Sequence, residues 1–106
     1  MSSGFKGFSV RELRFQRQHI LRATMEAIGL LAEEAVSLDV LRSRIAAARS
    51  DVAAKLDAFL AADDLLLVAT EQEDVSESEY AAAVTKRTMA RNALEATAKM
   101  PRSEDV

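Results

Sequence analysis

The sequence of 106 residues contains no cysteine and no tryptophan, and only three glycines and one proline. Without cysteine there is no disulfide framework, no thiol nucleophile and no cysteine-bound metal. Scarce glycine and proline leave little turn chemistry, whereas 20 alanines and 29% charged residues favour helices over strands. The composition therefore predicts one all-α domain over residues 1–106.

Long apolar runs are also missing. The strictly apolar stretches, at 27–32 and 65–69, are far shorter than the roughly 20 residues of a membrane-spanning helix. The N-terminal residues lack the apolar core of a secretion signal. We therefore expect a cytoplasmic protein that does not enter a membrane.

The first expected helix covers residues 9–36. Ser9 and Glu12 form a capping box, and Phe8 and Leu13 occupy the positions of a hydrophobic staple. Apolar residues then recur with the period of a helix that buries one stripe. Two polar residues, Arg17 and Thr24, interrupt this stripe.

The second expected helix covers residues 38–72 and has the most regular pattern in the chain. Its apolar residues alternate in steps of three and four, as in a coiled coil, with Lys55 as one interruption. We expect a break from the first helix near Ser37, which can act as an N-cap; one continuous helix over 9–72 is the alternative. The seam of this helix consists of Leu41, Ile45, Val52, Leu56, Phe59, Asp63 and Leu66.

The third expected helix covers residues 77–99. It begins with a second capping box, Ser76 and Glu79, and Pro101 prevents its continuation into the polar tail at 100–106. An antiparallel hairpin with the second helix, centred near residue 75, pairs residues whose numbers sum to about 150. The pairs of like character are Leu66 with Val84, Leu56 with Leu94, and Val52 with Ala98.

The same register places Asp63, the acid in the seam of the second helix, opposite Arg87, the base in the seam of the third. The sequence therefore predicts an ion pair between Asp63 and Arg87. We expect it to fix the register of the hairpin rather than to take part in catalysis.

Charge divides the chain into blocks. Residues 1–22 carry a net charge of +4, residues 50–80 carry −8, and the whole chain carries −3. A basic head and an acidic middle can attract each other within one molecule or between copies. Several large apolar residues, among them Leu65 and Val68, also lie outside the seam. We therefore expect a homo-oligomer.

The sequence contains few residues that could take part in catalysis. His19 is the only histidine, and its position on the first helix predicts an exposed side chain. No pattern for a metal, a nucleotide or a nucleophile is present, and adjacent acids such as Glu33 and Glu34 point in different directions on a helix. The sequence predicts a protein without a cofactor that is not an enzyme.

One face of the first helix combines arginines with an aromatic residue. Such a face can contact phosphates and stack on a base, or it can dock on a protein, where arginine and aromatic residues dominate binding energy. Phe5, Lys6 and Phe8 add further basic and aromatic character upstream. We favour docking on a larger protein partner over sequence-specific binding of DNA. The residues of this face are Arg11, Arg14, Phe15, Gln18 and Arg22.

The layout resembles a reduced phage-type small terminase subunit: a basic N-terminal segment, a helical hairpin formed by 38–69 and 80–98, and a polar tail at 101–106. The resemblance implies a ring that recruits DNA and regulates a larger motor protein. The helix-turn-helix usual in that family is missing here, so the implied DNA contact is weak and non-specific, through Arg11, Arg14 and Arg22. The alternative is a small inhibitor or chaperone whose acidic face, residues 63–79, binds a basic partner.

Overall fold

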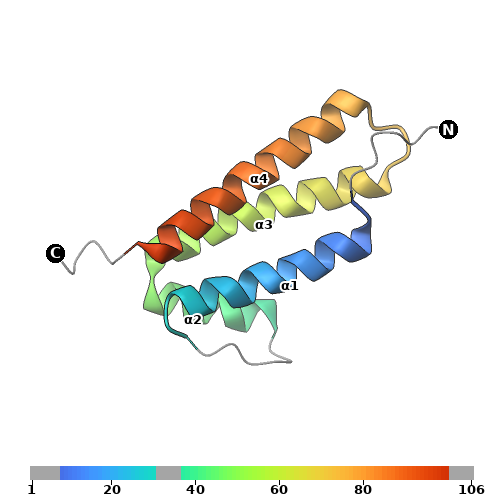
Figure 1. The fold of residues 1–106 in the computed structure, drawn as a ribbon. Coiled ribbons are helices and arrows are strands. Elements are labelled where there is room, and N and C mark those ends of the chain that lie inside the picture. The colour runs from blue at the N-terminus through green and yellow to red at the C-terminus, as the bar shows by residue number, and fades with distance from the viewer. Residues whose placement is uncertain (1–7, 31–36, 101–106) are drawn as a thin grey trace.

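Four helices make up the described part of the chain, residues 8–30 and 37–100 of a computed structural model. They are α1 (Val10–Ala27), α2 (Leu38–Ala48), α3 (Ser50–Glu71) and α4 (Glu77–Lys99), and these residues include no strand. The predicted all-α class is thus confirmed. In Figure 1, α3 and α4 run antiparallel and side by side. Helix α2 packs on α3, and α1 packs on both α3 and α4.

Helix α1 begins as predicted and ends earlier. The Ser9 side chain accepts a hydrogen bond from the Glu12 backbone, and the Glu12 side chain accepts one from the Ser9 backbone. The predicted end at residue 36 is wrong, because α1 stops at Ala27. Gly29 adopts φ +82° there, and the Gly29 and Leu30 amides donate to the carbonyls of Glu26 and Met25, which is a Schellman motif. Residues 31–36 lie outside the described part.

The break between the first two helices is present, so the continuous helix over 9–72 is wrong. Helix α2 begins after Ser37, whose side chain accepts a hydrogen bond from the Val40 amide. The single helix over 38–72 is also wrong, because the backbone is extended at Arg49 (φ −148°, ψ 97°), between α2 and α3. The turn folds α2 back on α3. Apolar residues on both sides of Arg49 are therefore buried in the same core, which stabilises the folded chain.

Helix α4 matches the predicted range of 77–99 and begins with the capping box of Ser76 and Glu79. Of the predicted tail, Met100 follows the helix, and residues 101–106 lie outside the described part.

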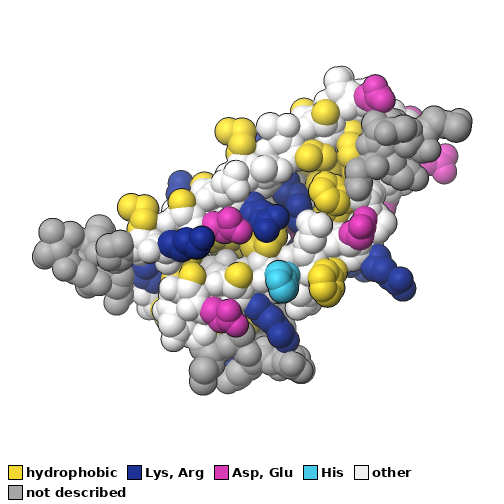
Figure 2. All heavy atoms as spheres, viewed as in Figure 1, with side chains coloured by type: hydrophobic (Ala, Val, Ile, Leu, Met, Phe, Trp, Pro, Cys, Tyr) yellow, Lys and Arg dark blue, Asp and Glu magenta, His cyan; other side chains and the backbone are white. Residues whose placement is uncertain are grey.

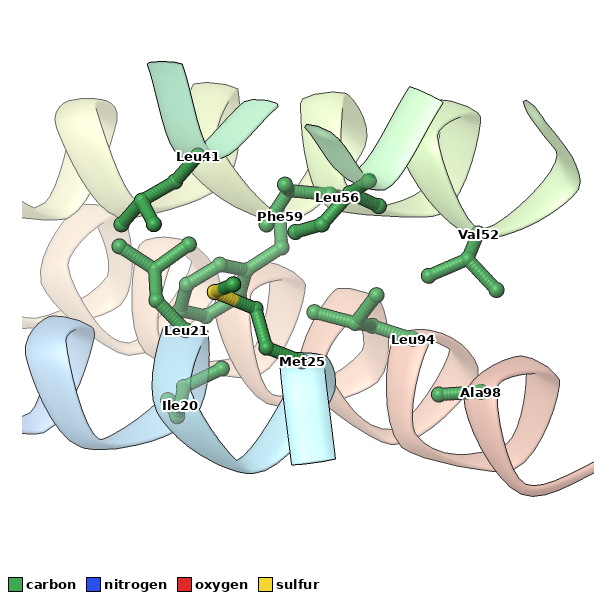
Figure 3. Close-up of a cluster of buried hydrophobic side chains, with 10 residues drawn as sticks. Ile20, Leu21, Met25, Leu41, Val52, Leu56, Phe59, Leu94 and Ala98 are labelled. Carbon is green, nitrogen blue, oxygen red and sulfur yellow. The ribbon is translucent and has the colours of Figure 1, made fainter. Parts of the chain in front are cut away.

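The core lies where the four helices meet. Figure 3 shows side chains from α1, α2, α3 and α4 converging around Phe59. The predicted partners Leu56 and Leu94 share this cluster with Val52 and Ala98. A second cluster near the α3–α4 connection contains Leu66, with Val84 packed against it.

The seam of residues 41–66 is therefore buried inside a single chain. Leu41, Ile45, Val52, Leu56, Phe59, Asp63 and Leu66 are all buried, as are Arg87 and Leu94 on α4. Lys55, which interrupts the seam, is exposed. The described residues span 53 × 30 × 16 Å, and no helix among them is long and apolar enough to cross a membrane.

Candidate partner-binding face of α1 and its buried anchor

Helix α1 has an inner and an outer face. The inner face buries Leu13, Ile20, Leu21 and Met25, together with Thr24, whose hydroxyl donates to the Ile20 carbonyl at 2.8 Å. Figure 2 shows basic, hydrophobic and histidine side chains gathered over the outer face of α1. All five predicted contact residues are exposed there: Arg11, Arg14, Phe15, Gln18 and Arg22.

Phe15 is the centre of this face. Its side chain is 71% exposed, and its ring stacks on that of His19 with centroids 6.1 Å apart and planes inclined by 14°. His19 is exposed, as predicted. Its stacking on Phe15 was not predicted, although residues four apart are neighbours on a helix surface. The outer face of α1 therefore presents two stacked rings to solvent.

The stacked pair separates two open hollows. The larger, of about 260 Å³, is lined by Phe15, Gln18, His19 and Arg22. The smaller, of about 70 Å³, lies on the side of α4 and includes Arg91. The larger hollow thus presents an aromatic wall, an amide and a guanidinium together, which suits a planar, polar ligand group.

Arg11 and Arg14 extend the charge of this face. Neither has an acidic partner among residues 8–30 and 37–100, whereas Arg17, on the same helix, is paired with two aspartates. The charges of Arg11 and Arg14 are therefore available to an external anion. Glu12, which lies between them, accepts a hydrogen bond from the Ser9 backbone in the capping box.

Helix α1 is held to the hairpin by a buried carboxylate. Arg87 Nε donates to Asp63 Oδ1 at 2.6 Å, which confirms the predicted ion pair. Arg17 Nε donates to the other oxygen of Asp63 at 2.7 Å, and Arg17 Nη2 donates to Asp64 at 2.5 Å. One wholly buried carboxylate thus joins α1, α3 and α4. We call Arg17, Asp63 and Arg87 the ion triad.

The prediction missed Arg17 as a partner, but its signal was present. Arg17 interrupts the apolar stripe of α1, so its side chain points towards the core, where a cation needs an anion. Burial acts to lower the pKa of Arg17, but hydrogen bonds to Asp63 and Asp64 outweigh it and raise that pKa above its ordinary value. Arg17 therefore remains charged, as the triad requires.

Aromatic rings enclose the other end of the triad. The Arg87 guanidinium lies 5.7 Å from the centroid of Phe8 and 5.4 Å from that of Phe59. The Phe8 amide donates to the Tyr80 hydroxyl at 3.0 Å, so the residue before the N-cap of α1 is tied to α4. Arg87 Nη2 is buried and has no hydrogen-bond partner within residues 8–30 and 37–100, where the ring contacts are its main compensation. These contacts fix the position of α1.

The acidic segment 63–79 is only partly available to a partner. Asp63 is buried and Asp64 is bonded to Arg17, whereas Glu71, Glu73 and Asp74 are exposed where α3 gives way to the α4 connection. Among the residues that the structure describes, no three acidic or histidine side chains are grouped closely enough to hold a metal.

No known protein family, curated protein or solved structure matches this chain.

Proposed function

We propose that the chain is a non-enzymatic helical adaptor of the small-terminase type, which self-associates, contacts DNA weakly through the outer face of α1 and serves a larger motor partner. The observation that carries the proposal is the exposed Phe15 ring, stacked on His19 and bordered by Arg11 and Arg14, which have no acidic partner among the described residues. Guanidinium groups bind phosphates, and an exposed ring can stack on any base.

The anchoring of α1 supports the same proposal. The helix is fixed by the ion triad on its inner side, so its outer side chains project from a rigid support. Rigid aromatic side chains lose little conformational freedom on binding. Because the chain carries a net charge of −3, we expect the DNA contact to be weak.

DNA binding is tested by fluorescence anisotropy with labelled single-stranded and duplex DNA over a range of salt concentrations. If the chain makes two to three phosphate contacts, the logarithm of the association constant for duplex DNA should fall linearly with the logarithm of the salt concentration. The expected slope is about −2 to −3. The double variant Arg11→Glu with Arg14→Glu should abolish binding. The matched control, Lys86→Glu with Lys99→Glu, changes the net charge by the same amount but on α4. This control should retain most of the DNA binding.

A variant of Phe15 distinguishes the contribution of base stacking to DNA binding from the contribution of charge. Phe15→Ala should weaken single-stranded binding by about tenfold, because each base stacked on an aromatic ring contributes on the order of 1–3 kcal/mol, and it should change duplex binding little. The DNA contact is refuted if the wild-type chain binds neither DNA at low salt. The exposed aromatic and arginine residues would then mark a site for a protein partner.

The second candidate function is an acidic inhibitor or chaperone, which the exposed acids Glu71, Glu73 and Asp74 favour. Under this proposal, changing these three residues to their amides should abolish binding to a basic protein surface while the Arg11 and Arg14 changes have little effect. A basic model protein such as a histone provides the measurement by titration calorimetry. Equal loss from both sets of variants would contradict a separate acidic site.

A further inference from the structure

Helix α3 carries a second apolar strip on the side opposite its core. The strip repeats in steps of four, three, four and three residues, the spacing of a coiled-coil seam, and it contains no charged residue. Leu65 and Val68 are 53% and 50% exposed although both are large and apolar. The outer strip consists of Ala54, Ala58, Ala61, Leu65 and Val68, all exposed.

The sizes along the outer strip are unequal. Its N-terminal half contains only alanines, whereas its C-terminal half ends with Leu65 and Val68. If a second α3 lies antiparallel across it, with Ala61 facing its own counterpart, Ala54 comes level with Val68 of the other copy. Small residues then meet large ones on both sides of the central pair of alanines, which is how close-packed surfaces interdigitate. The strip is therefore complementary to itself in the antiparallel direction.

The charges beside the strip fit the same arrangement. Asp57 and Asp64 border it seven residues apart, and each is bonded to an arginine from another helix, Arg42 and Arg17. In the antiparallel arrangement Asp57 comes level with Asp64 of the other copy. The two acids alone would repel each other, but each is already paired with its own arginine, which offsets the repulsion.

We propose that the outer strip of α3 is the surface on which two copies of this chain associate, antiparallel and about a twofold axis near Ala61. The inference names the surface for the self-association in the proposed function and does not depend on DNA binding. A contact about 21 Å long between two helices is small, so we expect dissociation in the micromolar range.

Sedimentation velocity over a series of concentrations tests the proposal. The wild-type chain should pass from monomer to dimer. Ala61→Glu should raise the dissociation constant more than about tenfold, because it places two carboxylates at the twofold axis. Ala96→Glu is the matched control, since Ala96 is an exposed alanine on α4 and lies outside the strip. Circular dichroism should show that both variants remain helical.

Cross-linking tests the register, because the chain has no cysteine of its own. Ala61→Cys should oxidise to a disulfide-linked dimer, whereas Ala96→Cys should remain monomeric. Ala54→Cys should cross-link with Val68→Cys in a mixture and not with itself. A wild-type chain that remains monomeric throughout, equal effects at 61 and 96, or self-linking of Ala54→Cys would overturn the proposal. DNA binding of the Ala61→Glu monomer, measured separately, keeps a failure here distinct from a failure of the α1 contact.

Discussion

The carboxylate of Asp63 on α3 connects this helix to α1 and α4. Its two oxygens accept hydrogen bonds from Arg17 and Arg87, and its side chain is wholly buried. Asp63→Asn should lower the free energy of unfolding by about 3–5 kcal/mol, because a buried arginine then lacks its counter-ion. Urea denaturation followed by circular dichroism measures the loss.

The neighbouring aspartate supplies the control. Asp64 receives one bond from Arg17, and its side chain is 68% exposed, so Asp64→Asn should cost less than about 1 kcal/mol. Equal losses at the two positions would mean that the burial of Asp63 contributes nothing.

Asp51 provides a prediction about pH. Two hydrogen bonds from the Arg49 guanidinium, with a smaller contribution from the Val52 amide, lower the pKa of Asp51 from 3.8 to about 2. A carboxyl group whose pKa is depressed by folding stabilises the native state above its unfolded pKa and loses that contribution as the pH falls towards 2. Carbon-13 NMR should find the Asp51 midpoint near pH 2. In Arg49→Gln the midpoint should return towards 3.8; a midpoint that stays near 2 would assign the shift to another group.

At the scale of the elements, Arg49 connects three helices. It lies between α2 and α3, and its guanidinium donates to the Thr97 and Met100 carbonyls at the end of α4, at 3.1 and 3.0 Å. Arg49→Ala should therefore destabilise the fold by about 2–4 kcal/mol, since buried charge-assisted hydrogen bonds are lost and carbonyls are left without donors. Thermal or urea unfolding measures this effect.

Arg42→Ala is the matched control for Arg49→Ala. Arg42 makes a bidentate pair with Asp57, but both side chains are about half exposed, so the loss should stay below about 1 kcal/mol. If Arg42→Ala were the more damaging change, the α2–α3 contact would depend on the surface pair rather than on the buried arginine.

The helix starts could be predicted because their causes are local. Ser9 with Glu12, and Ser76 with Glu79, satisfy backbone groups within four residues of one another. The end of α1 was predicted wrongly, at residue 36, although Gly29 followed by apolar Leu30 is the pattern of a Schellman motif and was a local signal for the true end. The turn at Arg49 was not, because its extended backbone is compatible with any residue and the carbonyls on α4 that its guanidinium binds lie 48 and 51 residues away.

At the scale of the whole molecule, the register of α3 against α4 was predictable from character alone, and the place of α1 was not. Apolar residues of the two helices could be matched with one another, and one acid with one base. These matches required facing residue numbers to sum to about 150, and the hydrogen bond between Asp63 and Arg87 agrees with that register. On the candidate site, exposure of the α1 residues followed from helical periodicity. The Phe15–His19 stack and the bond of Arg17 to Asp63 depend on side-chain conformations and on the packing of distant elements.

Hydrogen exchange should reveal how α1 is attached. Arg17 is the cation through which α1 reaches α3, so Arg17→Ala should speed amide exchange in α1 more than in α3 and α4, which pack on each other along their length. Mass spectrometry of peptides from each helix measures the difference. Uniform acceleration across all helices would show instead that α1 and the hairpin unfold as one unit.

The shared carboxylate of the ion triad also has a consequence for descent. Because Asp63 serves two arginines at once, no member of the triad can be replaced singly without leaving a buried charge or an empty acceptor. Lineages that share this fold should keep all three or exchange them together for apolar residues. In this chain the aspartate follows one arginine by 46 positions and precedes the other by 24. We expect this spacing to identify distant homologues whose overall sequence identity is too low to show the relationship.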